Sequence, residues 1–356
     1  MSETRAATTS PSRSSLTMLE LDDDRWQNFV AASGTSVFHH TAWSKLLAEC
    51  YGYPCFAAAV TDGNGRITAG VPLMEVSTPL RRRRRWISLP FTDYCPPILA
   101  AGGDGARLWA ELRHAQSESG LAEVEIRGEL DGSRSSPQAR GFRHTLALEG
   151  DTDAVFKSFR RSQVQRRIET ASERGVVVAR GEEASDLDSV FYGLHLKTRR
   201  RLGVPIQPKR FFRLLWERVL QEGLGFVLLA RAEGRPVAGA VFLTWRDSVI
   251  YKFGASDPSA RMLGANNLVI WRGIKWGCER GYATFDFGRT DLGAEGLRRF
   301  KNGWNPVEEP LVYTTLGTEL QASSSGVAQN TLAKVIQHSP LWVCRALGEM
   351  LYRYAA

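Results

Sequence analysis

The chain has 356 residues, 43% hydrophobic and 24% charged, which is the composition of a globular protein large enough for two modest domains. Its formal net charge of +8 favours an anionic partner, such as a nucleic acid, a nucleotide or an anionic lipid. Five cysteines with no C-x-x-C spacing argue against a disulfide framework and against a zinc site.

No apolar run approaches the roughly 18 residues of a membrane span, and the N-terminus lacks the apolar segment of a signal peptide. We therefore expect a soluble cytoplasmic protein whose thiols are reduced. Residues 1–16 are rich in Ser, Thr and Arg, a composition that predicts disorder.

The first half of the chain predicts two helices followed by a hairpin. The helices are expected to begin at Asp23 and at Thr41, with the threonine as the cap of the second helix. A Gly-rich turn at 62–65 separates two apolar runs and predicts a β-hairpin. The later elements of this half are expected at 86–91 (strand), 92–97 (loop), 106–119 (helix), 122–127 (strand) and 142–148 (strand).

The second half repeats this order. A basic helix (153–174), a short strand and two further helices precede residues 226–245, which match residues 56–76 element for element. Both segments read strand, Gly-Arg turn, strand containing Ala-Gly, and in both a strand, a helix and an acid-bearing strand follow. We expect a duplicated α/β domain, with a chance likeness of two hairpins as the alternative.

The repeat implies a first domain at 17–149 and a second domain at 150–320. The remaining residues, 321–356, carry apolar residues among basic ones and predict a helical tail interrupted at Pro340. The tail is expected to dock on the body, and peripheral contact with the inner face of a membrane is the alternative.

Residues 261–266 connect an expected strand to an expected helix at 267–280. They resemble the R/Q-x-x-G-x-G/A signature of GNAT acetyltransferases, in which loop amides at a helix N-terminus hold the pyrophosphate of acetyl-CoA. On this resemblance Arg261, Gly264 and Asn266 are the cofactor-binding candidates, with Asn266 in place of the last small residue of the signature. The alternative is a plain helix entry capped by Asn266 or Asn267.

The strand expected at 282–289 carries an acid among apolar residues. Alternation places Phe285 and Phe287 on one face and Asp286 on the other. A buried acid is costly unless it is paired. Asp286 is therefore either held by Arg289 or Arg298 in a structural ion pair, or it orients an amine or a phosphate-bearing substrate.

Lys301 stands just before Asn-Gly, where a helix must end. One interpretation is a solvated helix C-terminus. The other is an ammonium that neutralises the oxyanion formed during acyl transfer.

Several fragments follow one another between about residues 36 and 316: FHHTAW (38–43), YGYP (51–54), GVPL (70–73), SLPFTDYCPPIL (88–99), LHLKTRRRLGVP (194–205), KFGAS, FDFGR and RFKNGW. In this order they resemble the FemAB family of aminoacyltransferases, whose members consist of two GNAT-like domains in tandem. The resemblance implies an α/β fold in which each domain has a mixed, mostly antiparallel sheet flanked by helices. It also implies an active site in a cleft associated with the domains.

Family members transfer an amino acid from aminoacyl-tRNA to the amine of a peptidoglycan-precursor stem peptide. By analogy Lys301 stabilises the developing charge, and the substrate-binding candidates are Tyr251, Asp286, Asp93 and Arg289. The resemblance implies no obligatory cofactor and no metal, with an aminoacyl-tRNA or an acyl-CoA as donor. The expected partners are a phosphate-bearing envelope precursor and tRNA, and DNA is not expected.

Basic segments at 81–85, 160–167 and 199–201 could contact tRNA phosphates, with solvated faces as the alternative. The chain lacks the long helical-hairpin insertion of the better-known cell-wall members and looks nearer to relatives linked to exopolysaccharide or lipid-linked acylation. The first hypothesis is a FemAB-like acyltransferase that forms an amide on an amine-bearing envelope precursor. The second is an acetyl-CoA-dependent GNAT N-acetyltransferase, and the third is a non-catalytic double-GNAT binding module in envelope polysaccharide assembly.

Overall fold

The computed structural model describes residues 16–78, 83–130, 138–148, 151–317 and 326–352. The predicted disorder of residues 1–15 and the start of the basic run at 81–82 lie outside these ranges. Within them, no helix combines the length and the apolar character needed to cross a membrane.

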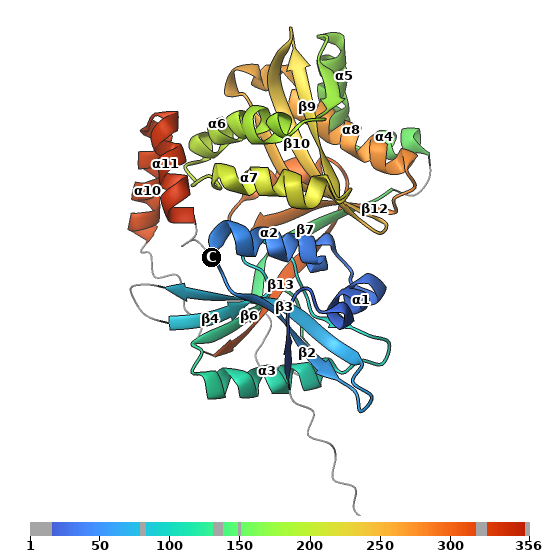
Figure 1. Cartoon of the computed structure of the whole chain (residues 1–356). Coiled ribbons are helices and arrows are strands. Elements are labelled where there is room, and N and C mark those ends of the chain that lie inside the picture. Colours follow the sequence, from blue (N-terminus) through green and yellow to red (C-terminus); the bar gives the residue numbers. More distant parts are fainter. Residues whose placement is uncertain (1–15, 79–82, 131–137, 149–150, 318–325, 353–356) are drawn as a thin grey trace, which may run out of the picture.

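The strands are β1 (Thr17–Leu19), β2 (Cys55–Thr61), β3 (Ile67–Thr78), β4 (Arg83–Ile87), β5 (Ile98–Leu99), β6 (Glu123–Ile126), β7 (Gln138–Ala147), β8 (Val177–Arg180), β9 (Gly225–Ala232), β10 (Arg235–Trp245), β11 (Ser248–Ser256), β12 (Thr284–Asp291) and β13 (Val307–Gly317). In the described chain they join into one sheet (Figure 1). Its order is β1-β2-β3-β4-β6-β13-β7-β12-β11-β10-β9-β8, and β5 pairs with β3 beside this path.

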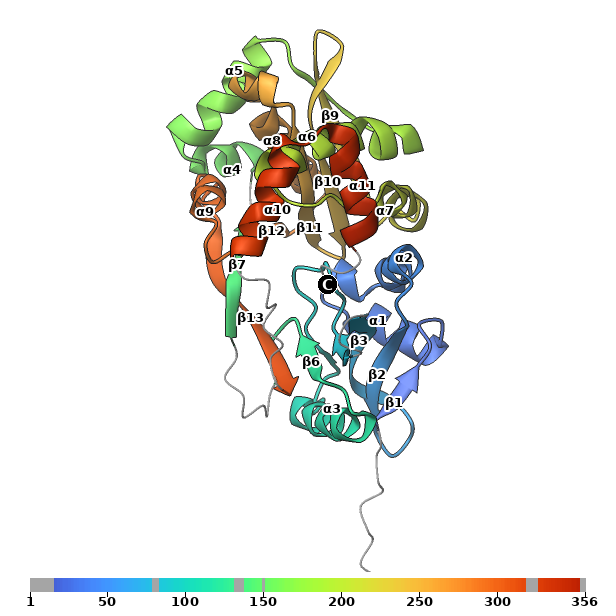
Figure 2. The same cartoon turned by 90° about the vertical axis from the view of Figure 1, so that its left-hand side faces the viewer.

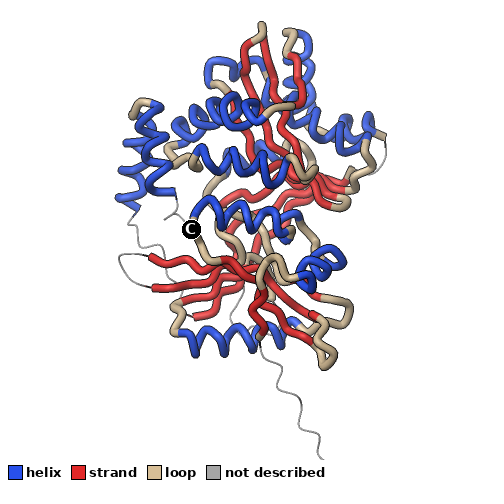
Figure 3. Tube along the Cα trace, viewed as in Figure 1, coloured by secondary structure: helices blue, strands red, loops and turns tan. Residues whose placement is uncertain are grey.

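The helices are α1 (Asp24–Ser33), η1 (Val37–His39), α2 (Thr41–Tyr51), α3 (Gly105–Ser119), α4 (Thr152–Ser158), η2 (Arg161–Gln165), α5 (Arg166–Glu173), η3 (Asp186–Phe191), α6 (Tyr192–Leu202), α7 (Lys209–Leu215), η4 (Trp216–Leu220), η5 (Pro258–Leu263), α8 (Ala265–Glu279), α9 (Glu295–Asn302), α10 (Gly326–His338) and α11 (Leu341–Leu351). They cover both faces of the sheet in each half of the molecule (Figure 3).

The predicted repeat is present. The first half has the order β2-β3-β4-α3-β6, and the second half has β9-β10-β11-α8-β12. In each half the two strands on either side of the helix pair in parallel, β4 with β6 and β11 with β12, whereas the hairpins are antiparallel. Each half is thus a mixed, mostly antiparallel sheet, as the sequence predicted.

The two halves exchange their last strands. β7 follows the first repeat in sequence but pairs with β12 of the second half and with β13. β13 follows the second repeat, and its end, Thr314 to Gly317, pairs with β6 of the first half. Figure 2 shows β7 and β13 side by side where the halves meet. The backbone hydrogen bonds of the sheet therefore run without a break from one half to the other.

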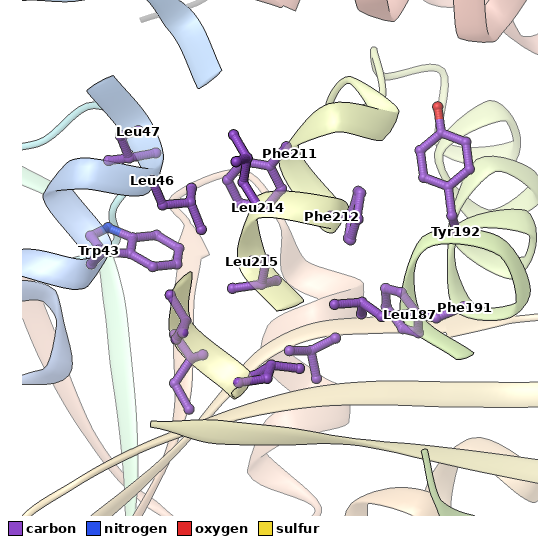
Figure 4. Close-up of a cluster of buried hydrophobic side chains, with 14 of the residues drawn as sticks. Trp43, Leu46, Leu47, Leu187, Phe191, Tyr192, Phe211, Phe212, Leu214 and Leu215 are labelled. Atoms are coloured by element: carbon purple, nitrogen blue, oxygen red, sulfur yellow. The ribbon is translucent and has the colours of Figure 1, made fainter. Parts of the chain in front are cut away.

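One hydrophobic core also joins the halves. Trp43, Leu46 and Leu47 on α2 of the first half belong to the same buried cluster as Phe211 and Leu214 on α7 of the second half (Figure 4). The Trp43 and Phe211 rings meet edge to face at 6.2 Å between centroids. Because buried aromatic contacts of this kind resist sliding, they fix the relative position of the residues on either side of the junction.

Two details differ from the sequence predictions. The cap of α2 is the His40 side chain, which accepts a hydrogen bond from the Ala42 amide at 3.2 Å, and not Thr41. The basic helix expected at 153–174 is divided into α4, η2 and α5. Phe159 leaves the helical conformation (φ −73°, ψ 150°) and its ring packs against Trp304 at 5.1 Å. Burial of this ring interrupts the helix, which local propensity alone does not predict.

The predicted tail consists of α10 and α11, and the chain turns between them at Pro340. Ile336 on α10 and Cys344 on α11 are buried in the core that joins the halves. The tail therefore docks on the body of the protein, as expected.

Candidate active site

A small pocket lies at the junction of the two halves. Its volume is about 20 Å³, which is room for roughly one water molecule. The first half contributes Ser36, Phe38, Asp93 and Tyr94, β7 contributes Arg143, and the second half contributes Ile250, Asp286, Gly288, Arg289 and Leu311. Three of the predicted substrate-binding residues, Asp93, Asp286 and Arg289, therefore meet at one pocket although they are far apart in sequence.

The pocket forms where two parallel strands separate. β11 and β12 pair only from Ser248 to Ile250, opposite Thr284 to Asp286, and diverge beyond that point. Gly288 lies just after the divergence with a φ of +71°, a conformation that favours glycine. A Cβ at this position would lie 3.2 Å from Asp93 Oδ2 and 3.4 Å from the Tyr251 carbonyl oxygen. Glycine thus permits the Asp93 loop to approach the strand.

Asp286 is only 7% exposed and is fully hydrogen-bonded. Its Oδ2 accepts from Arg143 Nε at 2.7 Å, and its Oδ1 accepts from the Gly288 amide at 2.8 Å. The predicted ion pair with Arg289 or Arg298 is wrong. Arg298 pairs with Glu308 at 2.6 Å, and the partner of Asp286 comes from β7, the strand that the first half supplies to β12.

Asp93 lies on a loop that hydrogen bonds from both halves hold in place. His39 Nε2 is 2.9 Å from the Pro96 carbonyl oxygen, and Trp43 Nε1 donates to Thr92 Oγ1 at 2.9 Å. The Tyr313 hydroxyl of β13 donates to the Asp93 carbonyl oxygen at 2.8 Å. These contacts on both sides of Asp93 explain why a loop can place a carboxylate reproducibly at the pocket.

Lys252 is a buried residue of this site that the sequence reasoning missed. It is an extra residue in β11, because Tyr251 pairs with Phe242 while Phe253 already pairs with Val241. Its side chain is 3% exposed, and its Nζ lies 3.2 Å from Asp93 Oδ2. Burial lowers the pKa of the Lys252 ammonium, and the Asp93 charge opposes this shift.

Aromatic rings surround the same ammonium. Its Nζ lies 4.9 Å from the ring centroid of Phe38 and 5.4 Å from that of Trp43. Such cation–π contacts compensate part of the cost of burying a charge. The lysine in KFGAS gave no sequence signal for this role, because a single-residue bulge is not visible in a hydrophobic pattern.

Lys301 is not among the residues that line the pocket, but it contacts two of them. It is 2% exposed, which excludes the interpretation as a solvated helix C-terminus. Its Nζ donates to the carbonyl oxygens of Gly288 at 2.8 Å and Arg289 at 2.9 Å, two residues that do line the pocket. Burial lowers the pKa of Lys301 to about 8, against the opposing charges of Asp93 and Asp286.

The two remaining substrate-binding candidates behave differently. Arg289 lines the pocket and donates to Asp291 Oδ1 at 2.7 Å and to the Tyr313 hydroxyl at 2.8 Å. Tyr251 points to the opposite face of β11, where its ring lies 5.9 Å from that of Phe242. Because side chains alternate along a strand, Ile250 faces the pocket and Tyr251 cannot. Only the Tyr251 carbonyl comes near Gly288.

The predicted cofactor loop lies away from this pocket, at the start of α8. Gly264 itself is the N-cap with a φ of +73°, so the alternative cap by Asn266 or Asn267 is wrong. A Cβ on Gly264 would lie 2.2 Å from the Arg167 carbonyl oxygen of α5. Asn267 Nδ2 donates to the Gln163 carbonyl at 3.4 Å, while Arg261 is exposed. The helix start is therefore packed against η2 and α5.

A family model described as an acetyltransferase (GNAT) domain matches residues 158–302. The match includes Asp286, Lys301 and the loop at the start of α8. The chain thus contains a GNAT-type acetyltransferase domain, which confirms the predicted acyltransferase class. No curated protein matches the chain.

Solved structures share the fold over most of the chain. FemX matches with a TM-score of 0.66 at 14% identity, covering 90% of this chain and 100% of that one. L-PGS from Bacillus licheniformis matches with a TM-score of 0.53 at 14% identity, covering 90% and 98%. A tandem GNAT protein from the clavulanic acid biosynthesis pathway matches with a TM-score of 0.50 at 11% identity, covering 85% and 97%. At these identities the likeness establishes the fold, and it confirms the tandem GNAT architecture expected from the FemAB resemblance.

Proposed function

We propose that this chain, which carries a GNAT acetyltransferase domain, forms an amide on an amine-bearing, phosphate-linked precursor of the cell envelope. The observation that carries the proposal is the pocket at the junction of the halves. There Asp93 and Asp286, one from each half, line the pocket, and the buried ammonium of Lys301 is hydrogen-bonded to the carbonyls of two further lining residues, Gly288 and Arg289. Carboxylate oxygens at the pocket are suited to accept hydrogen bonds from the N–H groups of an acceptor amine, and a buried cation is suited to stabilise an oxyanion.

In the proposed reaction the free amine of the acceptor attacks the carbonyl carbon of an activated acyl ester. A C–N bond forms, negative charge develops on the carbonyl oxygen, and the bond from carbon to the ester oxygen then breaks. The proton lost by the amine passes to the departing oxygen. The positive charge of Lys301 stabilises the negative charge that develops on the carbonyl oxygen in this step. Its Nζ is hydrogen-bonded to the Gly288 carbonyl oxygen, at the edge of the pocket. No side-chain base is obligatory, because an activated ester reacts readily with an amine.

The charge around the pocket supports an anionic acceptor. Lys252, Lys301, Arg143 and Arg289 supply four positive charges, and Asp93, Asp286 and Asp291 supply three negative ones. Arg143 and Arg289 are among the residues that line the pocket itself. An excess of cations in a place of low dielectric favours a substrate that carries a phosphate group.

For the donor, the packing of α8 favours an aminoacyl ester over an acyl-CoA. A pyrophosphate bound at the start of α8 would have to approach the Arg167 carbonyl oxygen, which already occupies the position next to Gly264. A carbonyl oxygen is the negative end of a dipole and repels an anion. In contrast, Arg160, Arg166 and Arg167 are exposed in the segment that packs against the start of α8, where they are available to tRNA phosphates.

The donor and the acceptor are tested together. The protein is incubated with an amine-bearing peptidoglycan precursor and either a pool of radiolabelled aminoacyl-tRNA or radiolabelled acetyl-CoA. We expect label in the precursor only from the aminoacyl-tRNA pool. Label from acetyl-CoA, together with tight binding of acetyl-CoA by calorimetry, would establish the N-acetyltransferase instead. Binding of the precursor without transfer from either donor would show a non-catalytic binding module.

A further inference from the structure

The tail presents an apolar stripe to the solvent. Trp342 is 72% exposed, the most exposed large apolar side chain of the described residues, and Met350 is 67% exposed. Trp342, Ala346 and Met350 follow one another at intervals of four residues along α11, so they lie on one face of the helix. Cys344 and Gly348, which are buried, form the opposite face. Exposure of this stripe is costly in water and needs an explanation.

Two neighbouring elements extend the stripe. Val335 on α10 is 47% exposed, and Leu202 at the end of α6 is 52% exposed. The end of α6 adjoins α10, because a Cβ on Gly203 would lie 3.0 Å from Ala333 Cβ. We call the solvent side of α10, α11 and the end of α6 the tail face. Figure 2 looks directly at it, and no other described element lies in front.

The charge of the tail face is positive. Arg201, Lys334 and Arg345 are exposed on it, and none of the three forms an ion pair within the described residues. Glu349 is the single acid between residues 326 and 352, and its Oε1 accepts from the Lys209 amide at 2.9 Å. Apolar side chains interspersed with unpaired cations match the interface of a membrane that contains anionic lipids.

The tail face is connected to the candidate active site. Tyr352, just beyond α11, is 9% exposed, and its ring lies 4.8 Å from that of Phe91. Phe91 begins the loop that carries Asp93, and its carbonyl oxygen accepts from Lys252 Nζ at 3.3 Å. The C-terminal end of the tail is therefore in contact with the loop whose Asp93 lines the pocket.

We propose that the tail face docks the protein on the surface of a membrane that contains anionic lipids, with Trp342 and Met350 inserted at the level of the headgroups. Arg201, Lys334 and Arg345 supply the electrostatic attraction. Docking goes beyond the proposed transfer reaction, because it concerns where the protein acts. It also places the pocket beside a membrane that can carry a lipid-linked acceptor.

The test uses the full chain and vesicles, and it requires no transfer activity. Vesicles of phosphatidylcholine alone are compared with vesicles that contain 30% phosphatidylglycerol, roughly the anionic content that attracts basic segments, and bound protein is measured by co-sedimentation. We expect binding to the anionic vesicles that weakens as salt is raised. The double variant Trp342→Ser, Met350→Ser should lose about tenfold in affinity.

Matched variants control for exposure and charge. Val177, on β8, is 66% exposed and lies outside the tail face, so Val177→Ser should bind like the wild type. Lys334→Gln, Arg345→Gln should weaken binding to anionic vesicles, whereas Lys275→Gln on α8 should not.

Absence of wild-type binding to anionic vesicles would overturn the proposal. So would a wild-type dimer that the Trp342 and Met350 variant converts to monomer, since the stripe would then be a protein interface. Failure of the transfer assay alone would leave vesicle binding unaffected.

Discussion

At the scale of single residues, burial of Lys301 determines the pH range in which its side chain is charged. Its ammonium is held by two backbone carbonyls of β12, and burial lowers its pKa to about 8. This value lies below the ordinary pKa of a lysine, so the charged form persists only up to about pH 8. A site that needs the cation would therefore lose it within an accessible pH range.

We expect the rate of transfer to fall above about pH 8 in the wild type, because Lys301 then releases its proton. In Lys301→Arg the side chain stays charged at all these pH values, so any activity that remains should show no alkaline decline. The measurement is kcat/KM against pH for both proteins. An unchanged alkaline limb in the arginine variant would assign that limb to another group.

Lys252 and Asp93 form a buried ion pair whose partners depend on one another. Lys252→Met removes the cation and leaves the partly buried Asp93 carboxylate without it, so we expect a loss of about 2 kcal/mol in the free energy of unfolding. The double variant Lys252→Met, Asp93→Asn should recover much of this loss, because no charge is left without a partner. Urea denaturation measures both values. Additive losses in the double variant would mean that the two side chains act independently.

The sequence predicted some of these residues and not others, for a physical reason. Alternation along β12 correctly placed Asp286 on a polar face, because that pattern is local. Its partner Arg143 could not be predicted. The two residues are 143 positions apart, and they meet only because β7, the exchanged strand, pairs with β12. The position of the Lys252 side chain depends on a bulge in β11, which a hydrophobic pattern does not reveal. The orientation of Tyr251 was not predicted, because a family motif does not state which face of a strand each of its residues occupies.

At the scale of elements, the pocket lies where β11 separates from β12, and Gly288 permits the Asp93 loop to approach β12 there. The hairpins and α8 were predicted from apolar periodicity and Gly-rich turns, whereas the mixed sheet was implied by the FemAB resemblance. The division of the basic helix into α4, η2 and α5 was not, because it follows from the burial of Phe159 against Trp304. Tertiary packing of this kind overrides helix propensity.

Gly288→Ala tests the contribution of this element. Gly281 has a similar φ of +74° but nothing within 4 Å of an added Cβ, so it provides a matched control. Both alanine variants should lose about 1 kcal/mol of stability from backbone strain. Gly288→Ala should in addition displace Asp93 and lower transfer at least tenfold, since its Cβ would lie 3.2 Å from Asp93 Oδ2. Equal activity in the two variants would contradict this account of the pocket.

At the scale of the whole molecule, the exchanged strands make the two halves one folding unit. β7 supplies backbone hydrogen bonds to both β12 and β13, and β13 supplies them to β6. The repeat in the sequence predicted a boundary near residue 150. It could not predict the exchange of β7 and β13 between the halves, because hydrophobic periodicity indicates where strands occur but not which strands are neighbours in the sheet.

A fragment of residues 151–356 lacks β6 and β7, so β12 would have an unpaired edge and β13 would lose both of its neighbouring strands. We expect this fragment to aggregate or to unfold without a cooperative transition. Residues 138–356, which retain β7, should be more soluble and show a sharper thermal transition. Cooperative unfolding of the shorter fragment with the stability of the full chain would show that the exchange contributes little.

We propose above all that the protein forms an amide at the pocket between the halves and that this reaction depends on the buried charge of Lys301. The most direct measurement is mass spectrometry of the amine-bearing precursor after incubation with an aminoacyl-tRNA pool and either wild type, Lys301→Ala or Lys275→Ala. Lys275 is a surface lysine, with its side chain 40% exposed, and serves as the control. We predict the added mass of one amino acid with the wild type and with Lys275→Ala, and none with a folded Lys301→Ala. Near-normal transfer by a folded Lys301→Ala would contradict the account.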